Sequence, residues 1–209
     1  MDQTAYFEQM RQKRRSEILA KARQMILAEG PMTFTMQNLA KSLDISNVTL
    51  YKYFKNSEDL LRTLYQETAK QYSISQVLYP QDGSPLDTFL QNIRFSLDEY
   101  LESREDTALL VILSLCGRAS GEALGDLFDE SFCEKETLLL SRAREEGQVR
   151  SDLSAGDTFR FLNSLCSSYL YRVALMTEQE YRAQKKEILR QTKELILMIR
   201  SYLTAPACP

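Results

Sequence analysis

A chain of 209 residues, 44% of them hydrophobic, can bury a substantial core as one domain or two small ones. Its first residues are polar, and no apolar run approaches the ~18 residues of a membrane span, so we expect a cytoplasmic protein without membrane contact. The chain has no histidine and no close cysteine pair, which disfavours ordinary zinc sites and catalysis that uses a histidine base. We therefore expect no metal, no cofactor and no enzymatic activity.

The charge is distributed unevenly along the chain. Residues 1–56 hold nine Lys or Arg against five Asp or Glu, a net charge of +4, whereas the remainder holds 17 against 24, a net charge of −7. A positive N-terminal part suits contact with phosphate groups, and an acidic remainder discourages nucleic acid from binding elsewhere.

The first predicted helix starts at about Thr4 or Gln12 and runs to Glu29, where Gly30-Pro31 stops it. Its buried stripe is formed by Ile18, Ala22, Met25 and Ile26. A basic cluster stands near its start and fits either a solvated helix end or a phosphate-contacting arm: Arg11, Lys13, Arg14 and Arg15.

Residues 33–61 predict two short helices separated by a tight turn. Thr35 is placed to cap a helix whose apolar face is Met36, Leu39, Ala40 and Leu43. Asp44 breaks that pattern, and Ser46 offers a second cap before Val48, Leu50, Tyr51 and Phe54. Two helices so close in the chain must cross sharply with Ile45 and Leu50 between them, which is the layout of a DNA-reading helix-turn-helix.

The rest of the chain is predicted to be helical. Ser57 can cap a connecting helix that continues toward about Leu78, and residues 79–85 form the clearest loop. Helical spacing then recurs over 86–102, 105–117, 121–147, 155–176 and 178–203, and no segment alternates like a strand. An all-α architecture follows.

The stretch from Arg14 to Leu61 resembles the N-terminal domain of the TetR family of bacterial transcriptional repressors. The resemblance is carried by Ile45-Ser46, by Thr49-Leu50-Tyr51-x-Tyr53-Phe54 and by Glu58-Asp59-Leu60-Leu61. It implies a three-helix DNA-binding domain over 1–56 and a helical bundle over 57–209 for ligand binding and dimerisation. It further implies a repressor that binds a palindromic double-stranded DNA operator as a homodimer and is released by a small-molecule effector.

The candidate DNA contacts fall into three sets. Asn47, Val48, Thr49 and Gln37 are placed to meet bases, since Asn and Gln can bond adenine and apolar groups can touch thymine methyls. Tyr51, Lys52, Tyr53 and Lys55 suit phosphate contacts, with a purely structural role open for both tyrosines. Thr35 and Ser46 are helix caps whose neighbouring N–H groups can also bind phosphate. The family commonly has lysine where Ser57 stands and a small residue where Val48 stands, so we expect an altered base contact at Val48.

The last two predicted helices are the candidates for a subunit interface, although both can instead pack within one subunit. Their apolar stripes are Phe159, Leu162, Cys166, Tyr169 and Val173 on the first helix and Ile188, Leu195, Ile199 and Tyr202 on the second. The resemblance implies that these helices form a four-helix contact between two subunits.

The resemblance also implies a ligand cavity in the C-terminal bundle. Its candidate aromatic lining is Phe89, Phe95, Tyr100, Phe128, Phe132 and Tyr169, with Arg94 or Arg118 available to meet an anion. For any one of these residues, an ordinary place in an aromatic core or, for the arginines, on the surface is the simpler interpretation. The densest acidic cluster, Asp126, Asp129 and Glu130, suits a carboxylate-dependent enzyme, but a solvated helix face explains it more simply. A protein-interaction adaptor without DNA readout is the other alternative.

Overall fold

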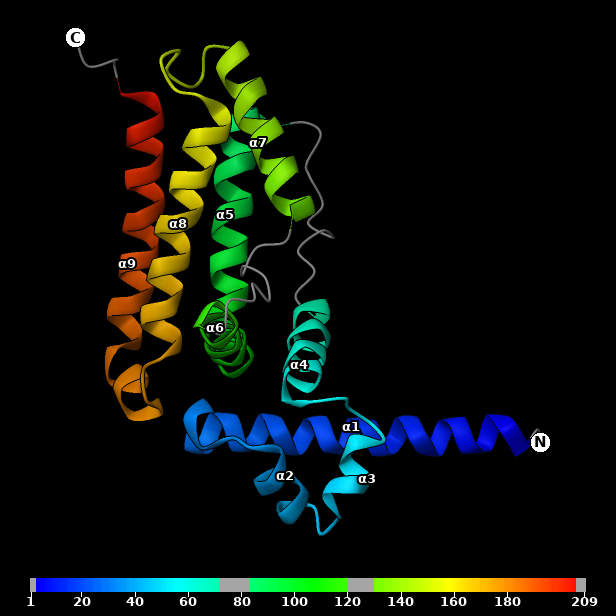
Figure 1. Cartoon of the computed structure of the whole chain (residues 1–209). Coiled ribbons are helices and arrows are strands. Elements are labelled where there is room, and N and C mark those ends of the chain that lie inside the picture. Colours follow the sequence, from blue (N-terminus) through cyan, green and yellow to red (C-terminus); the bar gives the residue numbers. More distant parts are fainter. Residues whose placement is uncertain (1–2, 72–82, 120–129, 206–209) are drawn as a thin grey trace. The chain divides into compact units, whose positions relative to one another are not determined.

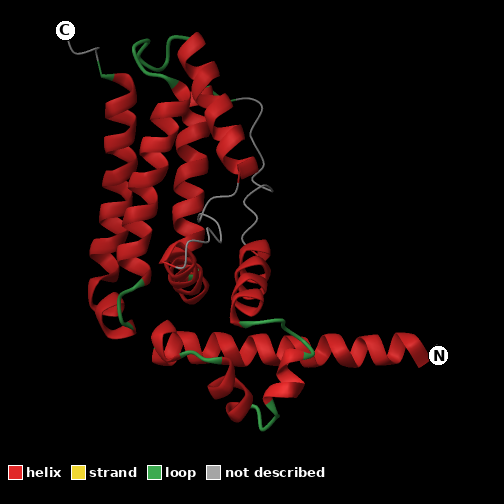
Figure 2. Ribbon diagram, viewed as in Figure 1, coloured by secondary structure: helices red, strands yellow, loops and turns green. Residues whose placement is uncertain are grey.

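In the computed structural model, the part of the chain that the structure describes is built mainly from α-helices (Figures 1 and 2). The structure describes residues 3–71, 83–119 and 130–205. Within these ranges no strand occurs, which confirms the all-α prediction, and no helix has both the length and the apolarity to cross a membrane. The helices are α1 (Gln3–Glu29), a 3-10 turn (Pro31–Thr33), α2 (Met36–Ser42), α3 (Asn47–Tyr51), α4 (Ser57–Gln71), α5 (Pro85–Glu102), α6 (Arg104–Ala119), α7 (Glu130–Glu145), α8 (Ala155–Ala174) and α9 (Glu178–Thr204).

The helices group into two compact units. The first unit contains α1 to α4 and the part of α6 from Leu109 onward; the second contains α5, the start of α6, and α7 to α9. The resemblance implies a boundary between two domains after residue 56, whereas α4 clusters with the helices before it. The division into domains of different function at residue 56 therefore stays a prediction.

In the first unit, α1 ends where the sequence predicted. Gly30 adopts a φ of 82°, and its N–H donates to the carbonyl of Ile26 at 3.1 Å. A residue with a Cβ is strained at such a positive φ, so glycine is the favoured terminator. The helix starts at Gln3, close to the earlier of the two predicted starts, and it buries Ile18 and Ala22 completely.

The turn between α2 and α3 matches the predicted helix-turn-helix. The Thr35 hydroxyl accepts from the Asn38 N–H at 3.0 Å, and the Ser46 hydroxyl accepts from the Thr49 N–H at 3.0 Å, so both predicted caps are confirmed. Asp44 adopts a φ of 53°, a left-handed conformation that short polar residues tolerate. The chain thereby reverses, and the Ile45 N–H donates back to the carbonyl of Ala40 at 3.1 Å.

The predicted cap of α4 is wrong by one residue. The Asn56 side chain accepts from the Asp59 N–H at 2.7 Å, and the Asp59 carboxylate accepts from the Lys55 N–H at 2.9 Å. The first of these hydrogen bonds makes Asn56 the N-cap and Ser57 the first helical residue, and the second holds the backbone just before the cap. The predicted continuation of α4 toward Leu78 lies outside the described residues, as do most of the predicted loop and the start of the helix predicted over 121–147.

In the second unit, α5, α7, α8 and α9 pack beside one another (Figure 1). Arg104, at the start of α6, joins that end of the unit to the α8–α9 connection. Its guanidinium donates to the carbonyl of Met176 at 2.6 Å and to the carboxylate of Glu178 at 2.7 Å, and it stacks over the ring of Tyr181 at 4.8 Å. The first residues of α6 are thus fixed to the second unit, while its residues from Leu109 onward cluster with the first unit.

The corrected cap yields a paired prediction. Asn56→Ala removes the side-chain acceptor of the N-cap and is expected to lower the free energy of unfolding by about 1 kcal/mol. Ser57→Ala, one residue later, is expected to change it by less than about 0.5 kcal/mol, because surface substitutions away from such features are nearly neutral. Urea unfolding at one fixed protein concentration measures both, and a larger loss for Ser57→Ala would contradict the assignment.

Candidate nucleic-acid interface

The helix α3 presents a polar outer face and buries its opposite side. Leu50 is 0% exposed and Phe54, just after the helix, is 1% exposed, so both side chains belong to the core of the first unit. On the outer face Asn47 is exposed, and Val48 and Tyr51 are 71% and 51% exposed. The structure therefore brings Asn47, Val48 and Tyr51 together on a surface where an amide and apolar groups can meet base edges.

Thr49 differs from its neighbours on α3. Its side chain is half-buried, and its hydroxyl lies 2.8 Å from the hydroxyl of Ser46. The hydroxyl is thus part of the cap that starts α3. Of the polar groups proposed for base contact, the amides of Asn47 and Gln37 are the more accessible, since both side chains are exposed.

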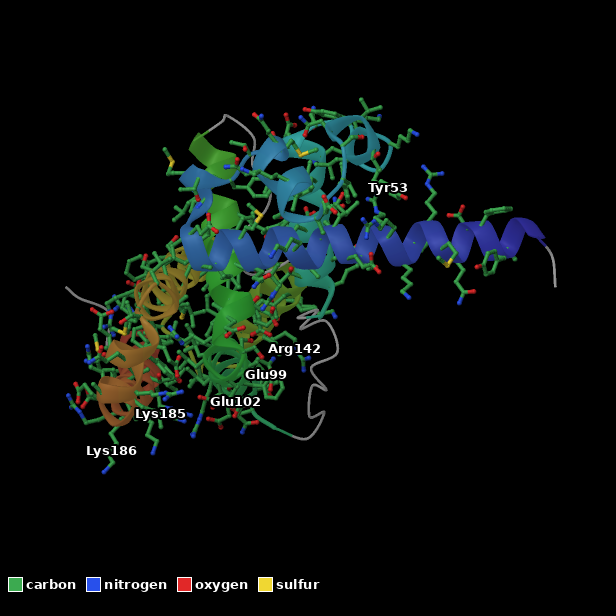
Figure 3. The ribbon with its side chains drawn as sticks, turned by 90° about the horizontal axis from the view of Figure 1, so that it is seen from below. Tyr53, Glu99, Glu102, Arg142, Lys185 and Lys186 are labelled. Atoms are coloured by element: carbon green, nitrogen blue, oxygen red, sulfur yellow. The ribbon has the colours of Figure 1, made fainter. Side chains whose placement is uncertain are left out.

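The residues suited to phosphate contact lie around the ends of α2 and α3. Thr35, Lys52 and Lys55 are exposed, and no ion pair within the described part of the chain involves either lysine. Tyr53 is half-buried and lies beside α1 (Figure 3). The two ammonium groups therefore keep their charge available to an external anion.

Arg15 has a structural role that the sequence analysis did not assign. Its guanidinium donates to the carbonyl of Tyr53 at 3.1 Å and to the hydroxyl of Thr63 at 3.2 Å, and it stacks over the ring of Phe54 at 4.4 Å. One side chain of α1 thus holds both the end of the α3 region and α4. Spacing could have indicated this role, since Arg15 precedes the buried Ile18 by three residues and Ala22 by seven.

Three of the candidate ligand residues lie in the core of the second unit. Phe89, Tyr100 and Phe132 are buried. The rings of Phe89 and Phe132 each lie 6.4 Å from the ring of Phe159, so α5, α7 and α8 share an aromatic cluster. This cluster packs the bundle interior.

The other ligand candidates do not join that cluster. Phe95 is 49% exposed, and Arg94 is exposed and pairs with Asp98 on the same helix at 3.5 Å. The side chain of Arg118 and the whole of Phe128 lie outside the described residues. A cavity lined by the full predicted set remains a prediction.

A buried polar pair, also absent from the sequence analysis, lies in the same unit. The amide of Asn92 on α5 donates to the carboxylate of Glu136 on α7 at 2.8 Å, and both side chains are buried. A buried carboxylate is costly unless it is hydrogen-bonded, so this contact ties α5 to α7. The two residues stand 44 positions apart, and no local pattern pairs them.

Most of the candidate interface residues pack inside the subunit. Seven side chains are buried there: Phe159, Leu162, Cys166, Val173, Ile188, Leu195 and Ile199. Tyr169, whose pKa is raised by burial, donates to the carbonyl of Ile188 at 2.8 Å, and Tyr202 is 38% exposed. Burial also raises the pKa of the Cys166 thiol to about 12, which leaves it protonated and unreactive in the folded chain. The contact of α8 and α9 with a second subunit stays a prediction.

Of the three residues suggested for carboxylate catalysis, the structure describes only Glu130. Asp126 and Asp129 lie outside the described residues, and Glu130 is exposed at the start of α7. Within the described residues, no group of three or more His, Cys, Asp or Glu side chains is arranged to hold a metal ion.

Residues 18–64 match the family model described as bacterial regulatory proteins, tetR family. This segment contains α2, α3 and most of α4, and it begins at the buried Ile18 of α1. The match confirms the resemblance seen in the sequence. A search of curated proteins found no match.

Solved structures with the same fold extend the similarity over nearly the whole chain. A putative TetR-family transcriptional regulator from Rhodococcus sp. is 15% identical, with a TM-score of 0.67, and the alignment covers 90% of this chain and 100% of that one. The fatty acid degradation regulator FadR from Bacillus halodurans is 15% identical, with a TM-score of 0.63 and coverage of 88% and 93%. The ketosteroid transcriptional regulator KstR2 of Mycobacterium tuberculosis is 16% identical, with a TM-score of 0.59 and coverage of 91% and 95%. Each of these three proteins is described as a regulator.

The role of Arg15 can be tested against its neighbour. Arg15→Ala removes two hydrogen bonds from a charged donor and a stacking contact, and it is expected to lower the free energy of unfolding by about 2 kcal/mol. Arg14→Ala removes an exposed pair with Glu17 and is expected to cost less than about 0.5 kcal/mol. Urea unfolding of both variants measures the difference, and equal losses would show that Arg15 does not hold these helices together.

Proposed function

We propose that this chain, whose N-terminal domain belongs to the tetR family of bacterial regulatory proteins, is a transcriptional repressor that binds a palindromic operator as a homodimer and releases it when a small molecule binds. The observation that supports this most is the exposed outer face of α3, held in place by the buried Leu50 and Phe54. The repressor role, the homodimer and the response to an effector belong to this proposal.

Base readout is assigned to the outer face of α3. In helix-turn-helix proteins the second helix lies in the major groove, with its N-terminal residues at the base edges. Asn47 stands at that end and is exposed, so its amide can form two hydrogen bonds with adenine. Val48 adds an apolar group beside it that can touch a thymine methyl.

Phosphate contact is assigned to Lys52 and Lys55, which follow the C-terminal end of α3. Ammonium groups act there as positive charges that hold the protein on the duplex without reading its sequence. The net charge of +4 over residues 1–56 supports this orientation, because the remaining −7 repels a polyanion.

The homodimer is assigned to an exposed apolar face of α8 and α9, which shares only Tyr202 with the stripes predicted from spacing. This face consists of Phe161, Leu165, Met198 and Tyr202, and the rings of Phe161 and Tyr202 lie 6.0 Å apart across the two helices. Leu165 and Met198 each lie one helical turn from one of these two aromatic residues. Exposed apolar groups gathered on one surface mark interaction sites. A second copy of the same face would bury them in a two-fold contact.

The effector response is assigned to the second unit. Its aromatic cluster and the buried Asn92–Glu136 pair provide apolar packing together with polar groups that can fix a ligand's orientation. Structures of this fold include a ketosteroid regulator and a fatty acid degradation regulator. A small molecule releases the operator only if it binds the released conformation more tightly than the bound one.

Selection of bound duplexes from a random pool tests the proposal. The full chain is expected to enrich a two-fold symmetric sequence, since two copies of α3 meet two half-sites. Against that operator, Asn47→Ala is expected to lose about 1–3 kcal/mol of discrimination at one base pair of each half-site. Lys55→Ala is expected to weaken binding to all sequences and to reduce the salt slope of the affinity by about 0.9 for each phosphate that the variant no longer neutralises.

These two variants control for each other, because one affects discrimination and the other affects affinity for any duplex. Both side chains are exposed, so neither variant should unfold the domain. Failure of the wild-type chain to enrich any sequence, or identical binding by both variants and the wild type, would refute the assigned reading surface.

A second paired experiment tests the homodimer. Met198 on α9 and Leu138 on α7 are 64% and 62% exposed, but only Met198 belongs to the proposed interface. Met198→Glu would bury a charge in the dimer contact and is expected to shift the sedimenting species toward the monomer and to weaken operator binding. Leu138→Glu is expected to change neither. Sedimentation velocity at several concentrations gives the result, and a dimer unaffected by Met198→Glu would place the interface elsewhere.

A further inference from the structure

The start of α1 and the residues just after α3 form the two walls of an open groove on the first unit. On the α1 wall, Phe7, Met10 and Arg14 recur at i, i+3 and i+7, so they form one stripe along the helix. Lys52 and Tyr53 form the other wall. The groove has a volume of about 800 Å³, within the range of roughly 300–1,000 Å³ that small-molecule sites occupy. It is therefore large enough for a small organic molecule.

Arg15 holds the two walls of the groove together. Its guanidinium donates to the carbonyl of Tyr53 at 3.1 Å and stacks over the ring of Phe54 at 4.4 Å. Phe54 is 1% exposed, and Ile18, one turn after Arg15 on α1, is 0% exposed, so both walls are anchored in the same core. This end of the groove is thus formed before any ligand arrives.

The outer part of the groove is apolar. Phe7 and Met10 are 62% and 48% exposed, and the ring of Tyr6 lies 6.0 Å from that of Phe7. Exposed apolar side chains gathered on one surface mark an interaction site, and a methionine adapts its shape to what it contacts. This part of the groove therefore favours an apolar group.

Cations border the apolar part on both sides. Successive residues of a helix are about 100° apart, which places Arg11 on one side of the stripe and Lys13 on the other. Within the described part of the chain, no ion pair involves Arg11, Lys13 or Lys52. Glu17, a carboxylate that also lines the groove, is paired with Arg14 at 2.7 Å. The groove therefore combines an apolar centre with positive charge that is available to an external anion.

We propose that this groove binds a small amphipathic anion, a monomeric molecule in which an apolar chain or ring carries one anionic group. The apolar body lies against Phe7 and Met10, and the anionic group meets the cations at the border of the groove. An inorganic anion would leave the two apolar side chains exposed, and a neutral apolar molecule would leave the cations without a partner. A molecule with both parts matches the groove.

A ligand at this site would regulate DNA binding by direct competition, and this consequence rests on the proposed function. Lys52 lines the groove and is assigned above to phosphate contact, so one ammonium group serves either the ligand or the operator. A ligand that binds the free chain better than the operator-bound chain shifts the population toward the free chain. This route differs from the response assigned to the second unit, because it requires no change of conformation.

Isothermal titration calorimetry of the full chain with decanoate, at concentrations where decanoate is monomeric, tests the site. The matched probes are acetate, which has the carboxylate without the chain, and decyltrimethylammonium, which has the chain with the opposite charge. Decanoate is expected to bind at least on the order of ten-fold more tightly than either probe, with an affinity that falls as salt is added.

Hydrogen–deuterium exchange locates the bound decanoate. From Ala5 to Lys13 every side chain is exposed, and a helical segment without packing partners is only marginally stable in water. A ligand that covers this segment stabilises it. Decanoate is therefore expected to slow exchange over residues 5–17 and 52–53.

Two double variants separate the charged part of the site from the apolar part. Arg11→Ala with Lys13→Ala is expected to weaken decanoate binding on the order of ten-fold and to reduce its salt dependence, because two cations are lost. Phe7→Ala with Met10→Ala is expected to weaken binding on the order of ten-fold while the salt dependence remains, because apolar contact is lost.

The matched control is Lys185→Ala with Lys186→Ala, which removes two exposed lysines of α9 (Figure 3) and should leave decanoate binding unchanged. Thermal unfolding of all variants without ligand should coincide with that of the wild type, because the substituted side chains are exposed.

Titration of the selected operator with and without decanoate tests the competition. The ratio of the two operator affinities is compared within each variant, so that any change in affinity without ligand cancels. The wild-type chain is expected to lose operator affinity as decanoate is added, and both groove variants are expected to lose less at the same concentration.

The outcomes separate this inference from the function on which its consequence rests. If the wild-type chain binds no duplex, the proposed function and the competition are overturned, and calorimetry and exchange alone decide whether the anion site exists. If decanoate binds no more tightly than its matched probes, slows exchange only in α5, α7, α8 or α9, or binds both groove variants as it binds the wild type, the inference is overturned and the proposed function stands. Groove variants that lose operator affinity but keep the full response to decanoate would show that the groove contacts DNA instead, which also overturns the inference.

Discussion

The reading surface depends on holding a helix that is too short to form alone. The five residues of α3 are far fewer than the roughly 12–15 that an isolated helix needs in water. The Ser46 hydroxyl accepts from the Thr49 N–H, Leu50 and Phe54 anchor the helix in the core, and Arg15 holds the carbonyl of Tyr53 just after its end. Asn47 and Val48 are exposed at a defined orientation only because these contacts fix the backbone beneath them.

The same contacts link the reading helix to the rest of its unit. Arg15 lies on α1 and bonds Thr63 on α4 as well as Tyr53, so the three segments share one guanidinium. A displacement of α4 relative to α1 would strain or break these bonds. In the second unit Arg104 has a comparable role, because it ties the first residues of α6 to the connection between α8 and α9.

Much of the first unit could be predicted from the sequence because its signals are local. The caps Thr35 and Ser46, the break at Asp44 and the stop at Gly30 each depend on residues within one or two turns of helix. Where two neighbouring residues can both cap, as at Asn56 and Ser57, composition alone does not decide, and the hydrogen bond that the Asp59 N–H donates to the Asn56 side chain identifies the first.

The features that sequence reasoning missed depend on contacts distant in the chain. Arg15 meets Tyr53 and Thr63 at separations of 38 and 48 residues, and Asn92 meets Glu136 at a separation of 44. For α8 and α9, helical spacing identified apolar stripes but not which stripe would face the interior. Phe159 and Ile199 are buried, whereas Phe161 and Leu197 are exposed, and packing of the whole bundle decides between them.

Hydrogen–deuterium exchange of the full chain, with and without its selected operator, tests the central claim most directly. If α3 is the reading helix, the operator will slow exchange most strongly over residues 35–55, where the caps and the end of α3 lie, and will leave the amides of the α5–α7 core nearly unchanged. Slowed exchange confined to α5, α7, α8 or α9, with residues 35–55 unaffected, would contradict the account.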